Sequence, residues 1–309
     1  MPRKPHKDVS SSFCLPPGRL FFAVRLVNYG GLPIIAAMTT PINDLPDAED
    51  DYERRFAGTR RLYGDETFVR FEQAHVLLAG AGGVGSWAAE AIARTGIGRL
   101  TLVDMDVLVA SNVNRQLPAL TDTFGRGKIE VLAERARAIN PRLDIRCVDD
   151  FLSWENLPEL MKDAPHLVLD CTDDLEAKVS MILWCRRRRI PLVVCGAAGG
   201  KKDPTQLRVS DLALTERDPL IAKIRRRLRH DYKFPTRPRE KFGIACVYSD
   251  EAVALPAGDS CDSSLSCSGY GSAVTVTATM GMLAVAEGLR QMVWRIELAA
   301  AREAGTWKG

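Results

Sequence analysis

The sequence predicts an α/β fold in which a doubly wound, mostly parallel sheet forms a Rossmann-like nucleotide-binding domain. Three observations lead to this prediction. Short apolar runs alternate with segments of helical spacing from Tyr52 onward, a glycine-rich loop joins the first run to the first such segment, and the 309-residue chain is 46% apolar. This length suffices for one large domain with a sizeable core. With 26% charged residues, the chain is globular rather than disordered or fibrous.

The predicted elements follow in order along the chain. Continuous apolar runs indicate strands buried on both faces of the sheet, and the segments of helical spacing between them indicate helices. The first two helices stop at Gly96 and at Asn140-Pro141. A strand-like run around Cys246 extends the sheet toward the C-terminus. The predicted strands cover residues 75–79, 99–103, 143–148, 166–169 and 190–194, and the predicted helices cover 84–95, 128–139 and 175–187.

Residues 272–289 form an apolar segment almost long enough to cross a membrane. We interpret it as a buried core helix, because it contains Glu287 and is rich in Thr, Ala and Gly. The apolar stretch at 20–38 holds Arg25 and a Gly-Gly-x-Pro sequence, so no membrane span is favoured there either. The predicted organisation is a disordered or artefactual N-terminal extension, one nucleotide-binding domain and a C-terminal tail. These cover residues 1–51, 52–290 and 291–309.

The spacing of cysteine and histidine residues predicts the redox state of the cellular compartment and the kind of metal site to expect. Eight cysteines are scattered without any C-x-x-C pair, and the four histidines are too dispersed for a histidine-based metal site. This pattern suits free thiols in a reducing compartment, so a cytoplasmic location is predicted and no zinc is expected.

A glycine loop suggests a nucleotide. Gly80, Gly82 and Gly85 match G-x-G-x-x-G between a predicted strand and a predicted helix, where glycines let the backbone approach phosphate and the helix N-terminus favours anions. Asp104 ends the next predicted strand, where a carboxylate can bind ribose hydroxyls. These features predict an adenine nucleotide but do not distinguish NAD from ATP.

Polar residues after the second predicted strand favour ATP. Asn, Arg and Lys side chains there can neutralise a triphosphate, whereas a dehydrogenase needs a nicotinamide pocket and a proton donor. Asp173, after a later predicted strand, can hold a metal ion beside the phosphates. The candidate nucleotide-binding residues are Gly80, Gly82, Gly83, Gly85, Asp104, Asp106, Asn112, Arg115, Gln116 and Lys128.

These stretches resemble the ubiquitin-activating-type adenylating superfamily, which includes the molybdopterin and thiamine biosynthesis adenylyltransferases. The shared features are the GAGGVGS loop, the DMD–NxNRQ block, the helix that begins at Lys128 and the DCTDD sequence. The resemblance spans roughly residues 52–290. Within the superfamily the chain most resembles the tRNA threonylcarbamoyladenosine dehydratase family, on segments that include 55–64, 86–90, 199–206 and 275–279.

The resemblance implies ATP and Mg²⁺ as cofactors, a tRNA substrate and a homodimer. Arg115 and Lys128 would act on the phosphates and Asp173 would hold Mg²⁺, while Arg61 would reach across the dimer into the partner's ATP site. A monovalent cation and a partner from a sulfurtransferase system remain open. The molybdopterin and thiamine relatives carry paired C-x-x-C zinc motifs that this chain lacks, and the segment from Leu255 to Cys267 is shorter than expected for the dehydratases.

Basic residues cluster late in the chain, at 186–189, 223–229 and 233–241, although the net charge is only +3. Since the whole molecule is not strongly basic, these clusters suggest a local phosphate-binding patch suited to a tRNA stem, although no series of aromatic residues accompanies them in the sequence. A solvated face is the competing interpretation. Cys246 can in principle carry an acyl or persulfide group, but a buried, unreactive thiol is favoured.

Three functions stay open from the sequence. The first is ATP-dependent dehydration and cyclisation of the threonylcarbamoyl group on tRNA adenosine next to the anticodon. The second is adenylation of the C-terminal glycine of a ubiquitin-like sulfur carrier. The third is a nicotinamide dehydrogenase or a non-catalytic nucleotide-binding module, which would leave Arg115, Lys128 and Asp173 without a role.

Overall fold

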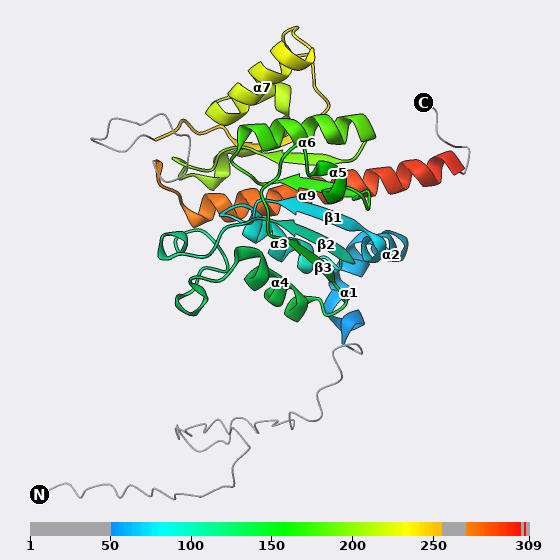
Figure 1. Ribbon diagram of the computed structural model, residues 1–309. Helices are drawn as coiled ribbons and strands as arrows, with labels where there is room; N and C mark the ends of the chain where they lie inside the picture. Colours follow the sequence, from blue (N-terminus) through cyan, green and yellow to red (C-terminus); the bar gives the residue numbers. More distant parts are fainter. Residues whose placement is uncertain (1–50, 255–269, 304–305, 307–309) are drawn as a thin grey trace, which may run out of the picture. The chain divides into compact units, whose positions relative to one another are not determined.

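A computed structural model describes residues 51–254, 270–303 and 306 (Figure 1). Within them a seven-stranded sheet has the order β3-β2-β1-β4-β5-β7-β6, and all neighbouring strands are parallel except β6 and β7. The predicted α/β fold and the extension of the sheet by later strands are confirmed. The strands are β1 (His75–Ala79), β2 (Arg99–Val103), β3 (Asp144–Val148), β4 (Leu167–Asp170), β5 (Leu192–Cys195), β6 (Leu207–Asp211) and β7 (Ala245–Ser249).

The expectations for residues 1–50 and for the segment from Leu255 to Cys267 lie outside the described residues. The predicted N-terminal extension and its boundary with the domain therefore stay predictions.

Helices cover both faces of the sheet, as a doubly wound topology requires. Alternate residues of β1 point into two apolar clusters, one shared with α3, α4 and α9 and the other shared with α5, α6 and α7. Two further helices, α1 and α2, precede β1. The helices are α1 (Tyr52–Tyr63), α2 (Asp65–Gln73), α3 (Gly85–Ala93), α4 (Lys128–Ile139), α5 (Leu157–Leu160), α6 (Leu175–Arg188), α7 (Pro219–Tyr232) and α9 (Val274–Glu303).

The predicted boundaries agree closely with the structure for the strands and helices nearest the glycine loop. β1, β2 and α4 begin and end at the predicted residues, and β3, β4, β5, α3 and α6 differ by at most two residues at either end. Continuous burial explains the agreement. Every residue of β1, β4 and β5 is buried, and few structures other than a buried strand are compatible with such short apolar runs.

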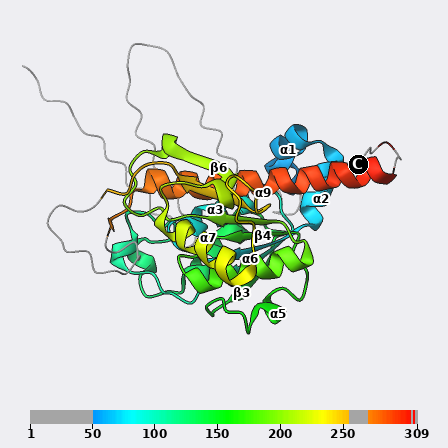
Figure 2. The ribbon, with the colours of Figure 1, turned by 90° about the horizontal axis from the view of Figure 1, so that it is seen from above.

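Helix α9 is longer than the sequence predicted. It starts near the expected residue but continues beyond Leu289 through residues expected to form a tail, and it ends at Glu303. Its first half is buried against α3 and the sheet, and its second half extends beyond the sheet beside α2 (Figure 2). The second half is solvated and carries charged residues, so the apolar pattern that predicted the first half of the helix does not continue through it. Among the described residues no helix is long and apolar enough to span a membrane.

The contact between α9 and α3 depends on a glycine. A Cβ added at Gly281 would lie 2.4 Å from Val84 O and 3.0 Å from Ala88 N, so α9 approaches the start of α3 more closely than any other residue type permits. Gly58, in the middle of α1, has no atom within 4 Å of the same position.

We expect Gly281→Ala to lower the melting temperature and Gly58→Ala to leave it unchanged or raise it. Overpacking costs about 1–3 kcal/mol, and each kcal/mol shifts Tm by about 2–4 °C in a domain of this size. At Gly58 the only effect is the better helix propensity of alanine, which raises the free energy of unfolding by up to about 1 kcal/mol. Thermal unfolding followed by circular dichroism measures both variants. Equal shifts in the two variants would contradict the close contact between α9 and α3.

Candidate functional site

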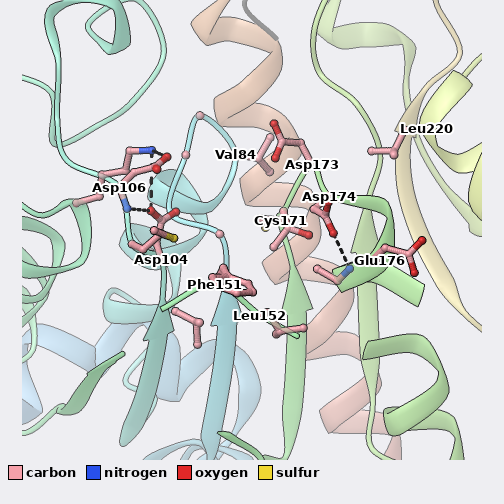
Figure 3. Close-up of a pocket in the computed structure, with 18 of the residues that line it drawn as sticks. Val84, Asp104, Asp106, Phe151, Leu152, Cys171, Asp173, Asp174, Glu176 and Leu220 are labelled. Carbon is pink, nitrogen blue, oxygen red and sulfur yellow. Dashed lines mark hydrogen bonds and ion pairs between the residues drawn. The ribbon is translucent and has the colours of Figure 1, made fainter. Parts of the chain in front are cut away.

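The strand order reverses between β1 and β4, because the chain builds outward from β1 through β2 and β3 and then adds β4 on the other side of β1. Open α/β sheets bind ligands outside the carboxyl ends of the strands at such a point. A cavity of about 790 Å³ lies there, lined by the loops that follow β1 and β4. Figure 3 shows Asp104 and Asp106 on one side of it and Asp173 and Asp174 on the other.

The glycine loop leads from β1 into α3, and two of its glycines are required by packing. Gly80 has a φ of +84°, and a Cβ there would lie 2.8 Å from the backbone of Cys171. A Cβ at Gly85 would lie 1.7 Å from Gly80 O. Gly82 has no atom within 4 Å on that side and lines the cavity. The loop thus brings the N-terminus of α3, a favourable place for anions, to the cavity.

Asp104 fixes the glycine loop from the end of β2. Its Oδ2 accepts a hydrogen bond from Ala81 N at 2.6 Å, and its Oδ1 accepts one from Asp106 N at 2.9 Å. A carboxylate has about four acceptor positions, so these two bonds leave others for a ligand hydroxyl. Asp104 therefore both shapes the loop and lines the cavity.

Lys128 begins α4, and its ammonium lies in the wall of the cavity with only 5% of the residue exposed. Its Nζ is 2.7 Å from Asp106 Oδ2 and 3.9 Å from Asp104 Oδ1. The backbone N–H of Lys128 also donates to Asp106 O, so the two residues are held together twice. This pairing orients a positive charge toward the glycine loop.

The residues that follow the short helix η2 (Ala110–Asn112) bring further polar groups to the cavity. Arg115 Nη1 donates to Ser111 O at 2.8 Å, and within the described ranges the guanidinium has no carboxylate partner. Gln116 is buried, and its Oε1 has no hydrogen-bond partner in that part of the chain. A guanidinium without a carboxylate partner and an unsatisfied amide oxygen on one wall are groups that a bound ligand can satisfy.

Asp173 and Asp174 follow β4, and only one of them has a structural partner among the described residues. Asp174 is the N-cap of α6, because its Oδ1 accepts from Ala177 N at 2.7 Å. Asp173 is exposed and lines the cavity, with no hydrogen bond or ion pair to any residue of 51–254 or 270–303. Its carboxylate is free to bind a cation.

A fully buried ion pair supports the loop that carries Asp173. Lys178 Nζ donates to Asp170 Oδ1 at 3.0 Å and to Cys195 O at 2.8 Å, which joins the ends of β4 and β5. Asp170 also accepts from Thr172 N and Oγ1, which shapes the loop. Burial raises the pKa of Asp170, while the pKa of Lys178, which burial alone would lower, is raised by the Asp170 carboxylate. Such a pair positions the loop rather than reacting.

The thiols of Cys171 and Cys246 both have raised pKa values. Cys171 Sγ lies 3.7 Å from Cys195 Sγ, and this contact and burial raise the pKa of Cys171 well above its usual value. Burial also raises the pKa of Cys246, which is completely buried in β7. Since the thiolate is the nucleophile, a raised pKa disfavours reaction at either sulfur. The favoured interpretation of Cys246 as an unreactive thiol agrees with this geometry.

The structure brings most of the predicted site residues together and separates two. Gly80, Gly82, Gly83, Asp104, Asp106, Asn112, Arg115, Gln116, Lys128 and Asp173 all line the cavity. Gly85 acts behind the loop, in the contact with Gly80 O, and does not line it. Arg61 lies exposed on α1 and is likewise absent from the cavity wall of its own chain.

Sequence reasoning missed the loops that follow β3 and β5. Residues 150–155, Gly196–Ala198, Leu220 and Thr277 also line the cavity. The predicted strands were enough to place these two loops at the site, since the carboxyl ends of parallel strands meet at one edge of a sheet. Leu220 and Thr277 come from α7 and α9, and their position depends on packing that no local pattern reveals.

The residues present fit a nucleoside triphosphate. The glycine loop, Lys128 and Arg115 supply backbone and cationic donors on one side, and the Oε1 of Gln116 lacks a partner in the described part. No group of three metal-ligating side chains occurs in the described ranges, so a Mg²⁺ ion here would be held by Asp173 together with water and phosphate oxygens.

Comparison with known proteins places the chain in a family. The model of the ThiF family matches residues 52–302. The tRNA threonylcarbamoyladenosine dehydratase of Escherichia coli is 45% identical over 255 residues, which cover 79% of this chain and 95% of that protein. The enzyme of the same name from Haemophilus influenzae is 43% identical over 248 residues, with 79% and 95% covered.

Solved structures agree with this placement. The crystal structure of the Escherichia coli dehydratase in complex with ATP has a TM-score of 0.74 and 45% sequence identity, and the match covers 80% of this chain and 97% of that one. The glycine loop, the switch-point cavity and these matches lead to one conclusion: the chain belongs to the ThiF family.

Proposed function

We propose that this chain is an ATP-dependent tRNA threonylcarbamoyladenosine dehydratase. It adenylates the carboxylate of the threonylcarbamoyl group on the tRNA adenosine next to the anticodon, and it releases a cyclic product. The 45% identity to a relative of that name, over 95% of its length, supports this function. The observation that carries it is the cavity in which Lys128, Arg115 and a free Asp173 surround the glycine loop.

The arrangement suits transfer of AMP to a carboxylate. A carboxylate is a poor electrophile at neutral pH, and attack of its oxygen on the α-phosphorus of ATP converts it into an acyl adenylate as pyrophosphate leaves. Negative charge builds on the departing phosphates, and Lys128 and Arg115 are the cations on that wall that stabilise it. A Mg²⁺ ion at Asp173 would neutralise further charge on the pyrophosphate.

The second step closes a ring within the substrate. A nitrogen or oxygen of the same threonylcarbamoyl-adenosine attacks the activated carbonyl, and AMP leaves. No protein nucleophile is needed, which agrees with the raised pKa values of the Cys171 and Cys246 thiols. The enzyme's contribution is to position the reacting groups and to keep water from the activated carbonyl.

Adenylation of a sulfur-carrier protein is the alternative, and it has less support. Relatives named molybdopterin-synthase adenylyltransferase match only 41–42% of this chain, at 33–37% identity. The C-x-x-C pairs expected of those relatives are also absent from the full sequence.

The basic clusters divide into structural and available cations. Arg225 Nη1 donates to Thr215 O at 2.6 Å, and Arg227 Nη1 lies 2.8 Å from Glu176 Oε1, so these residues stabilise the fold. Other cations are exposed and have no carboxylate partner in the described part, so they are available to bind the phosphates of a tRNA backbone. They include Lys223 and Arg226 on α7, and Arg237 and Arg239 in the loop that follows it.

We also propose a homodimer in which Arg61 completes the partner's site. Arg61 is exposed and absent from its own cavity, and the adjacent Leu62 is 77% exposed on the same helix. A cytoplasmic location is proposed as well, since the five cysteines in the described ranges are free thiols. The described cysteines give no support to a sulfurtransferase partner, because Cys246 is buried and the exposed Cys147 lies outside the cavity.

With ATP, Mg²⁺ and tRNA bearing threonylcarbamoyladenosine, we expect the protein to release pyrophosphate and to form a nucleoside lighter by one water. Lys128→Ala should slow both by about 100-fold or more, because one donor to developing charge is worth that much. Arg126→Ala is the matched control, since this nearby cation pairs with Glu134 and does not line the cavity. Mass spectrometry of digested tRNA and a pyrophosphate assay measure both. Adenylation of a carrier protein instead of a tRNA product would contradict the proposal.

Replacing Lys223 and Arg226 by Gln should flatten the salt dependence of tRNA binding. Each lost phosphate contact lowers the slope of log K against log salt by about 0.7–0.9. Arg99→Gln/Lys162→Gln removes the same charge elsewhere on the surface, where both residues pair with acids. Filter binding between low and moderate salt gives the slopes. Identical slopes for the two double variants would exclude the α7 patch as the tRNA site.

Mixing Arg61→Ala and Lys128→Ala protomers should restore activity if Arg61 acts across a dimer. Each mixed dimer then has one complete site, so random 1:1 reassembly recovers about a quarter of the wild-type rate. The measurement is pyrophosphate release after reassembly from dissociated protomers. Activity that stays at the level of the separate variants would mean that Arg61 acts within its own chain or not at all.

A further inference from the structure

The loop after β3 places two aromatic side chains at the cavity that the proposed adenylation does not use. Phe151 and Trp154 both line the cavity and are 63% and 40% exposed. Asn156 holds the loop in place, because its Nδ2 donates to Phe151 O at 2.7 Å and its Oδ1 accepts from Ser153 N at 3.0 Å. The exposed rings are therefore presented by a fixed loop.

Trp154 is backed by a second tryptophan. Its ring lies edge-on to Trp184 of α6, with centroids 5.7 Å apart and planes at 78°. Trp184 is largely buried, and its Nε1 has no hydrogen-bond acceptor in the described part. Packing of this kind restricts the Trp154 ring while part of its surface stays accessible.

Two arginines at the end of α6 lie beside these rings, and a third lies beside Phe234. Arg187 Cζ lies 5.6 Å from the centroid of Trp154, and Arg188 Cζ lies 3.6 Å from that of Trp184. Arg186 Cζ lies 4.1 Å from the Phe234 ring. None of the three has a carboxylate partner among residues 51–254 and 270–303. The sequence shows no aromatic series beside these charges because the rings come from three separate segments, which the fold brings together.

The spacing of residues along α6 connects the tryptophan rings and the arginines, as one group, to the cavity. Glu176 and Ser180 line the cavity and Trp184 is four residues further on, so one side of the helix runs from the cavity to the arginines. At 1.5 Å per residue, Trp184 lies about 12 Å along the axis from Glu176. The group therefore extends away from the end of α6 where Asp173 and Asp174 lie.

We infer that Trp154, backed by Trp184 and flanked by Arg187 and Arg188, stacks against a base of single-stranded RNA beside the reacting adenosine. This inference rests on the proposed function and names a contact for its substrate. A ring stacks on any base, and unpaired guanidinium groups bind the phosphates that accompany it, a combination by which proteins recognise RNA loops. The anticodon loop supplies unpaired bases next to the target.

Trp154→Ala should raise the KM for tRNA about fivefold or more, because loss of one base–aromatic stack weakens binding by that factor. The Kd for ATP and the maximal rate should stay within twofold of the wild type. Trp154→Phe keeps a stacking ring and should recover most of the affinity. Trp294→Ala is the matched control, since Trp294 is 56% exposed on α9 and lines a different cavity.

Tryptophan fluorescence gives a direct readout that does not depend on the alanine variant folding. Stacking of a base on an indole quenches its emission. An anticodon stem–loop RNA should therefore quench the wild type more than Trp154→Phe, and the same sequence annealed into a duplex should quench both equally. Equal quenching of the two proteins by the stem–loop would overturn the inference.

Other results separate this contact from the alternatives. A Kd for ATP that rises in Trp154→Ala as much as the KM for tRNA would assign the ring to the adenine of ATP and overturn the inference. Failure of the wild type to form a cyclic nucleoside would refute the proposed function alone, because the quenching measurement detects RNA on the ring without any turnover.

Discussion

The close approach of two loops at the reversal of strand order is the constraint on which the site depends. Gly80 leaves β1 with a positive φ, and its Cα lies against the backbone of Cys171 after β4. Any side chain at Gly80 would separate the two loops, and any side chain at Gly85 would displace α3 from β1. Because both contacts are backbone to backbone, they hold the glycine loop against the loop after β4, which favours the preorganisation that an enzyme needs to stabilise developing charge.

Two lysine–aspartate pairs border this crevice and have different roles. Lys128 pairs with Asp106, whose side chain is 67% exposed, so its charge can be shared with a ligand that enters the cavity. Lys178 pairs with Asp170 in complete burial, and the pair is linked to the backbone of β4 and β5. Removing one partner of a buried pair leaves an uncompensated charge and destabilises strongly, whereas the partly exposed pair is available for chemistry.

The sequence was sufficient for the sheet near the glycine loop and for most of one wall of the cavity. Strands such as β1 are short, apolar and buried on both faces, and the glycine pattern has a strict steric reason, so local patterns determine both. Helix α9 was underestimated because its second half is solvated and charged. Phe151 and Trp154 were missed because an exposed aromatic residue in a loop has no periodicity, and Trp154 meets Trp184 and Arg187 only after α6 packs on the sheet.

Hydrogen–deuterium exchange with and without ATP and Mg²⁺ tests most directly whether the crevice between β1 and β4 is where the nucleotide binds. The account predicts slower exchange of backbone amides in residues 80–86 and 171–178, the two loops that meet there, with little change along the second half of α9. Protection confined to other surfaces, with these two loops unchanged at saturating ATP, would contradict the assignment of the site.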